Sequence, residues 1–224
     1  MDKKIPAILY LDRNGFYFYT LGMENVATCV FPETMVRDLE VVDPFGVENQ
    51  IKTFVNQLNL PPFDISIVLS SNIVFEKIVQ SGSGELEEIN KFLEEVPFER
   101  YEKIITIEEG NKRVFAANKN LTYCLEMSFT KVGSSVSIVV PYYPLSNLLQ
   151  TLPLDVSSAQ AILKKVGDLK SYNMKRIEEK QEIRTSVDTS SGQQKTPVNK
   201  NRIYILAAVF VVLIGVMLFM IFKH

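Results

Sequence analysis

The chain has 224 residues, a formal net charge of −2 and a single histidine, His224, which follows the last apolar stretch. No imidazole is therefore available elsewhere for a catalytic triad, a proton shuttle or a metal site, which argues against most hydrolase chemistries. The near-neutral charge and the absence of a basic stripe argue against nucleic-acid binding. The two cysteines, Cys29 and Cys124, lie in apolar surroundings and are expected to be reduced core residues of a cytosolic domain.

The first elements are predicted to be β-strands. Residues 7–12 are an apolar run that ends in an acid, and residues 16–21 are aromatic and β-prone. The sequence Arg-Asn-Gly at 13–15 supplies a turn between them, so the two runs predict a β-hairpin. Residues 27–31 predict a third strand.

Residues 36–42 have no periodicity that assigns them a state. Apolar residues then recur at helical spacing over residues 47–58, which predicts an amphipathic helix. The short continuous apolar run at 65–69 is typical of a strand that is covered on both faces. The order to this point is three strands, a helix and a strand.

An inserted unit is predicted next. Residues 73–79 predict a strand, and residues 85–96 predict a helix with one apolar face and one acidic face. Strands are predicted at 103–107 and 113–117, with Gly110 and Asn111 in the turn between them.

Helical spacing returns over residues 121–132, and Gly133 follows as a typical C-terminal cap. Residues 136–140 predict another buried strand. A helical stretch is predicted through residues 145–149, and a weaker one from 157 to 170.

The composition changes at Ser171. Residues 171–202 are rich in charged and small polar residues, which predicts a flexible tether with a reach on the order of 30 Å. Residues 203–222 contain no charge, and a helix of that length spans about 30 Å, so they predict one transmembrane helix. A buried core helix is the alternative, but core helices keep a polar stripe. Basic residues are more frequent before this span than after it, so we expect a tail-anchored protein with its N-terminal part in the cytosol.

Asp12 is the one acid placed like a functional residue, at the end of the first predicted strand, where α/β folds often hold a nucleotide phosphate or its Mg²⁺. A plain hairpin-turn aspartate is the alternative, because Arg13 and Asn14 occupy the places that a phosphate cradle gives to glycine. No phosphate-loop or nucleophile motif occurs. The adjacent glutamates 108 and 109 are expected to be solvated. We predict no catalytic residue, no metal site and no cofactor.

Three stretches resemble proteins of the PilM family, the actin-like cytosolic components of type IV pilus assembly platforms: residues 65–79, 85–109 and 113–145. The resemblance covers about residues 5 to 150. It implies an α/β fold, a single actin-like (ribonuclease H-like) half-domain at residues 1–170 with a βαββ insert at about 73–117. Of the family's first phosphate loop only Asp12 is present, and the second half of the fold has no counterpart. The apolar segment at 203–222 resembles the membrane helix of the related type II secretion component GspL.

This resemblance implies a non-catalytic, membrane-tethered scaffold of a pilus or secretion platform. Such a protein would lie in the cytoplasmic (inner) membrane and dock platform proteins in a groove near residues 73–115. One alternative is an ATP-binding actin-like protein that completes its cleft as a homodimer. Another is a tail-anchored fusion protein of the longin-SNARE kind. It is disfavoured because such a protein requires a long heptad helix before the span, and this interval is interrupted by Pro153, Gly167, Gly192 and Pro197.

Overall fold

The computed structural model describes residues 4–108, 110–149 and 154–175. The predicted membrane segment at 203–222 and most of the predicted tether lie outside these residues. In the described part of the chain, no helix is long and apolar enough to span a bilayer.

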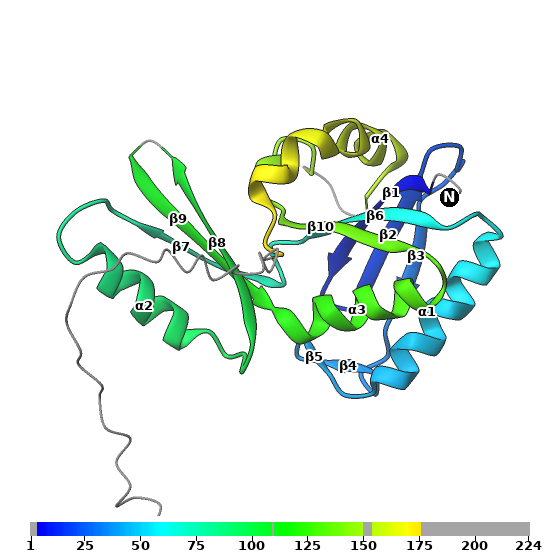
Figure 1. Ribbon diagram of the computed structural model, residues 1–224, viewed down its shortest axis with the longest axis horizontal. Helices are drawn as coiled ribbons and strands as arrows, with labels where there is room; N and C mark the ends of the chain where they lie inside the picture. The colour runs from blue at the N-terminus through cyan, green and yellow to red at the C-terminus, as the bar shows by residue number, and fades with distance from the viewer. Residues whose placement is uncertain (1–3, 109, 150–153, 176–224) are drawn as a thin grey trace, which may run out of the picture. The chain divides into compact units, whose positions relative to one another are not determined.

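A five-stranded mixed sheet forms the centre of the fold, in the order β10-β6-β1-β2-β3 (Figure 1). Its strands are β1 (Ile5–Asp12), β2 (Gly15–Thr20), β3 (Ala27–Val30), β6 (Phe63–Leu69) and β10 (Ser135–Pro141). β1, β2 and β3 pair antiparallel, whereas β6 is parallel to both β1 and β10. A sheet that combines antiparallel and parallel strands, with helices packed on it, confirms the expected mixed α/β fold.

Helices cover both faces of this sheet because its strands are apolar on both sides. Helices α1 (Pro44–Leu58) and α3 (Lys119–Lys131) pack on the face that carries Phe16, where the rings of Phe54 and Phe129 lie 5.1 and 6.0 Å from it. Helix α4 (Val156–Lys165) packs on the opposite face, over Tyr10 and Tyr19 (Figure 1). Burial of these large side chains stabilises the sheet between two helical layers.

The unassigned stretch at 36–42 forms a small hairpin of β4 (Val36–Arg37) and β5 (Glu40–Val41). Its two turn residues, Asp38 and Leu39, both have positive φ angles. Two-residue strands are too short to show a periodicity in the sequence.

The insert between β6 and α3 is a three-stranded sheet with the order β7-β9-β8 and one helix. Its elements are β7 (Val74–Val79), α2 (Glu85–Glu95), β8 (Tyr101–Glu108) and β9 (Asn111–Asn118). Two ion pairs, Lys77 with Glu88 and Lys112 with Glu85, join the sheet to α2. Asn111 is paired with Glu108, so it is the first residue of β9 and not a turn residue as expected.

Two predictions near the end of the domain are wrong in detail. The stretch 145–149 is not an α-helix: a 3-10 turn, η1 (Tyr143–Leu145), is followed by further turns. Three leucines at helical spacing span only about one turn, which is too short to nucleate a helix. The chain also stays packed beyond residue 171. After α4 it continues as η2 (Val166–Tyr172), and Met174 is 1% exposed.

Candidate functional site

Asp12 lies at the carboxyl end of β1, as the sequence predicts. Its Oδ1 accepts hydrogen bonds from Ser70 Oγ at 2.7 Å and from Asn72 Nδ2 at 3.0 Å. Both donors follow β6, whose parallel pairing with β1 brings the two carboxyl ends together. Asp12 lines a cavity of about 310 Å³ together with Arg13 and Asn14. Within the described ranges, no group of three His, Cys, Asp or Glu residues is placed to hold a metal ion.

The turn after Asp12 packs closely against β3. Gly15 has φ +149°, and a Cβ atom there would lie 2.0 Å from the carbonyl oxygen of Cys29. Arg13 turns outward to an exposed ion pair with Asp38 at 3.2 Å. Gly15 therefore allows β2 and β3 to approach each other closely, and this role in strand packing differs from the role of glycine in a phosphate-binding loop.

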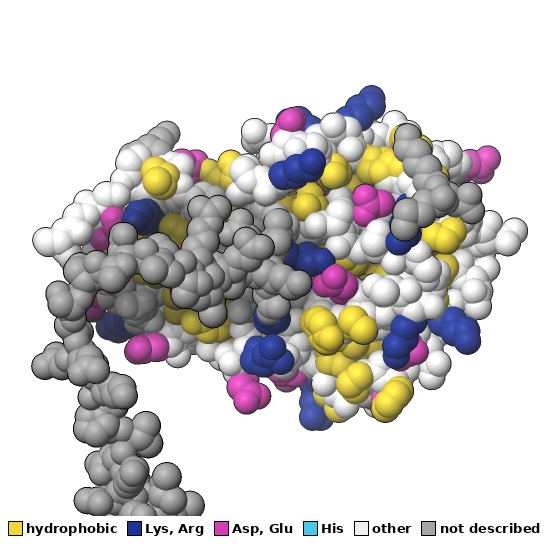
Figure 2. Space-filling view, viewed as in Figure 1, with side chains coloured by type: hydrophobic (Ala, Val, Ile, Leu, Met, Phe, Trp, Pro, Cys, Tyr) yellow, Lys and Arg dark blue, Asp and Glu magenta, His cyan; other side chains and the backbone are white. Residues whose placement is uncertain are grey.

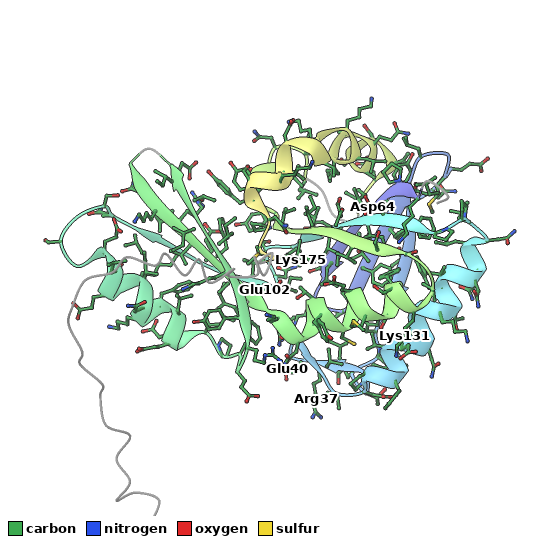
Figure 3. All side chains as sticks on the ribbon, in the orientation of Figure 1. Arg37, Glu40, Asp64, Glu102, Lys131 and Lys175 are labelled. Atoms are coloured by element: carbon green, nitrogen blue, oxygen red, sulfur yellow. The ribbon has the colours of Figure 1, made fainter. Side chains whose placement is uncertain are left out.

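A second and larger concave site lies between the insert and α3, with a volume of about 790 Å³. We call it the basic groove. Its lining comes from the start of β8, the first turns of α3 and the end of the described chain: Arg100, Tyr101, Glu102, Lys103, Lys119, Asn120, Tyr123, Glu126, Met174 and Lys175. Figure 3 labels Glu102 and Lys175 in this region. The groove overlaps the predicted range of 73–115 only at residues 100–103.

Local hydrogen bonds fix the α3 wall of the groove. Asn118 caps the helix, because its Oδ1 accepts from the backbone N–H groups of Asn120 and Leu121 at 2.8 and 3.2 Å. The same side chain donates to the carbonyl oxygen of Leu39 at 3.1 Å. The first turn of α3 is thus held in place from both sides.

The groove carries four basic and two acidic side chains. Lys175 is neutralised by Glu126 at 2.6 Å, whereas in the described part of the chain Arg100, Lys103 and Lys119 form no ion pair. Burial raises the pKa of the Glu102 carboxyl, against a hydrogen bond from Thr122 and the charge of Lys119, which lower it. The net field of the groove is positive and favours an acidic ligand.

The floor of the groove comes from a segment that the sequence did not identify. Residues 173–175 run along β10, the edge strand of the central sheet. The backbone N–H of Met174 donates to the carbonyl oxygen of Val139 at 2.7 Å, and Asn173 Oδ1 accepts from the Val139 N–H at 3.0 Å. Lys175 Nζ donates to the carbonyl oxygen of Val136 at 2.9 Å. The only local signal was an apolar Met174 after Tyr172, inside a charged stretch.

A polar cluster joins the strands of the insert to η1. Arg113 pairs with both Glu76 and Glu108, and its guanidinium lies 4.1 Å from the centre of the Tyr143 ring. The hydroxyl of Tyr143 donates to Glu108, and that of Tyr142 donates to Glu76 at 2.8 Å. Burial and the neighbouring Glu76 raise the pKa of Tyr142 to about 12. Glu108 is solvated as expected, with a side chain that is 41% exposed, and it also helps to hold the insert on the domain.

Comparison with known proteins finds similarity only in structure. No protein-family model matches the chain, and no curated protein matches it. The PilM-PilN type IV pilus biogenesis complex contains a similar chain, with 15% identity over 65% of this chain and 51% of that one, at a TM-score of 0.44.

Two further structures are similar. One is the cytoplasmic domain of EpsL, an inner membrane component of the type II secretion system of Vibrio cholerae (10% identity, 62% of this chain, 58% of that chain, TM-score 0.38). The other is a Bacteroides thetaiotaomicron protein of unknown function with an actin-like ATPase fold (13%, 64%, 54%, TM-score 0.34). A PilM complex, as the sequence motifs suggested, and a cytoplasmic domain of a type II secretion component are thus among the similar structures. The chain spans little more than half the length of the structures that it matches.

Proposed function

We propose that the chain is a non-catalytic docking protein that binds an acidic peptide segment of a partner in the basic groove. The observation that carries this proposal is the set of three cations, Arg100, Lys103 and Lys119, that form no ion pair in the described part of the chain and line one concave surface. Clustered charges of one sign repel each other, and a site that keeps them is expected to serve an oppositely charged ligand.

The cellular location and the partner class are inferred from the sequence resemblance and from the apolar segment at 203–222. Motifs similar to those of the PilM family suggest that the partner belongs to a type IV pilus or type II secretion platform. The apolar segment at 203–222 would hold the domain at the inner membrane, with the groove in the cytoplasm.

The proposed function includes no catalytic turnover of a nucleotide. In support of this, Asp12 Oδ1 is engaged by Ser70 and Asn72, and the turn beside it carries Arg13 and Asn14 where a phosphate would need open backbone N–H groups. Calorimetry with Mg-ATP is expected to show no binding to the full chain. Micromolar binding that is lost in Asp12→Ala would contradict this part and favour the ATP-binding alternative.

Crosslinking in native membranes tests the docking function. The full chain is expected to crosslink to proteins of a pilus or secretion platform, and Lys103→Glu should reduce the yield about tenfold by placing an acid against an acidic ligand. Lys91→Glu is the matched control, because Lys91 is exposed on α2 and does not line the groove. Equal crosslinking of both variants, or the absence of platform proteins, would contradict the proposal.

The membrane assignment has its own test. The full chain is expected in the membrane fraction after alkaline extraction, whereas a variant without residues 203–224 should be found in the supernatant. Recovery of the full chain in the supernatant would contradict a transmembrane anchor.

A further inference from the structure

An apolar pocket adjoins the basic groove along α3. It has a volume of about 420 Å³ and is lined mainly by Val41, Pro44, Phe45, Tyr123, Cys124 and Met127. Large apolar side chains around it are exposed: Phe45 by 76%, Tyr123 by 57%, Val42 by 50% and Met127 by 39%. Figure 2 shows hydrophobic side chains gathered on this part of the surface, over β4, β5 and the start of α1. Aromatic residues and Met in an exposed cluster are typical of binding surfaces.

The pocket and the groove share two lining residues, Asn120 and Tyr123. Lys119, Tyr123 and Met127 follow each other at intervals of four residues, so they form one stripe along α3. The stripe is basic at the start of the helix and apolar further on. The two hollows therefore adjoin each other, and a ligand that leaves the groove over Tyr123 reaches the pocket.

We infer that groove and pocket together form one bipartite site, whose ligand is a partner peptide with an acidic part and a bulky apolar part. This inference rests on the proposed docking function and specifies its partner. The acidic part of the peptide is complementary to the positive charge of the groove. Because the pocket adjoins the groove, the apolar part is assigned to the same peptide. The Lys131–Glu48 ion pair borders the pocket, and its opposite charges cancel each other there.

The helix sets the spacing of the two parts. Lys119 and Met127 are separated by eight residues of α3, or about 12 Å at about 1.5 Å per residue. An extended peptide covers this length in about four residues. Acidic residues should therefore precede or follow the apolar anchor by about four positions.

Selection of random peptides displayed on phage, with the full chain in detergent as bait, tests the inference. Enriched peptides are expected to combine acidic and bulky apolar residues at this spacing. Synthetic copies should lose about tenfold in affinity for Lys103→Glu and, independently, for Phe45→Ser. Leu86→Ser and Lys91→Glu are the controls, because both residues are exposed on α2, away from the site.

Cys124 provides a direct readout, since it lines the pocket and is the more accessible of the two cysteines. A bound peptide is expected to slow the alkylation of Cys124 at least several-fold. Without peptide, Cys124 should react much faster than Cys29. If Cys124 were as slow as Cys29 in the free full chain, part of the chain itself would cover the pocket, and the inference would be overturned.

The variants separate this inference from the proposed function. Sensitivity to Lys103→Glu alone would keep the groove as a docking site and overturn the extension into the pocket. Sensitivity to Phe45→Ser alone would contradict both, because the groove would then have no part in binding. A selection that enriches no peptide, or peptides insensitive to either change, would also contradict both.

Discussion

Gly15→Ala should destabilise the domain far more than an ordinary glycine substitution in a turn. Gly15 pairs with Asp12 on one side and with Val30 on the other, so it lies where β3 meets the hairpin. An alanine Cβ at this position would lie 2.0 Å from the carbonyl oxygen of Cys29 and 2.9 Å from the Cα of Val30. Since both contacts are with backbone, no side chain can rotate away to relieve them.

Two costs add up in this variant. A non-glycine residue at positive φ costs about 1–2 kcal/mol. The clash also forces β3 away from the turn, which weakens the hydrogen bond from Phe31 N to Asn14 O, now 2.9 Å, and at least one bond of the ladder. At about 1 kcal/mol for each of these two hydrogen bonds, the total is at least about 3–4 kcal/mol.

Gly22→Ala is the matched control. Gly22 also has a positive φ, +94°, but a Cβ there would meet no atom within 4 Å. Its cost should be the conformational one alone, about 1–2 kcal/mol. Urea unfolding followed by circular dichroism measures both variants, and the difference between them isolates the close approach of β3. Equal losses of stability in the two variants would refute the reasoning.

Three further predictions concern the walls of the two hollows. Asn118→Ala should lower the free energy of unfolding in urea by about 2–3 kcal/mol, because it removes both a helix cap and a buried hydrogen-bond donor. Asp155→Ala, which removes an exposed helix cap, should lower it by about 1 kcal/mol. Equal losses in the two variants would contradict the role assigned to Asn118. The raised pKa means that the folded protein binds the Glu102 proton more tightly than the unfolded chain does. The stability that this gives is fully present below the ordinary pKa of 4.5, and it is lost as the pH rises through the raised pKa. Glu102→Gln should thus match the parent chain below pH 4.5 and be more stable at pH 7, and a variant that is less stable at pH 7 would contradict this. Burial raises the pKa of Cys29 to about 11, so mass spectrometry after brief alkylation at neutral pH should find label on Cys124 first, and on Cys29 only in denaturant.

The order of elements was accessible from the sequence because hydrophobic periodicity is a local property. The first three strands, the βαββ order of the insert and the position of Asp12 all follow from runs of a few residues. The errors lie where periodicity is short or absent. The β4–β5 hairpin has two-residue strands, and the leucines at 145–149 cover only about one helical turn.

The candidate site depends on contacts that are distant along the chain. Arg100, Lys119 and Lys175 come from three separate segments, and they share a groove only because β8 starts beside α3 and residues 173–175 pair with the edge of β10. The role of Glu108 is similar, since its partner Tyr143 lies 35 residues away. Neither the cations of the groove nor the Glu108–Tyr143 contact has a spacing in the sequence that could have predicted it.

By itself, then, the sequence determined most of the strands and helices and the acid that ends the first strand, and its apolar residues 203–222 predict a membrane span. The tertiary structure decided which groups that acid contacts and where the concave surfaces lie. Strand register and helix packing are set by hydrogen bonds and buried contacts between distant residues, and these bring Asp12 to Ser70 and Asn72 and place the cations of the groove beside an exposed apolar pocket.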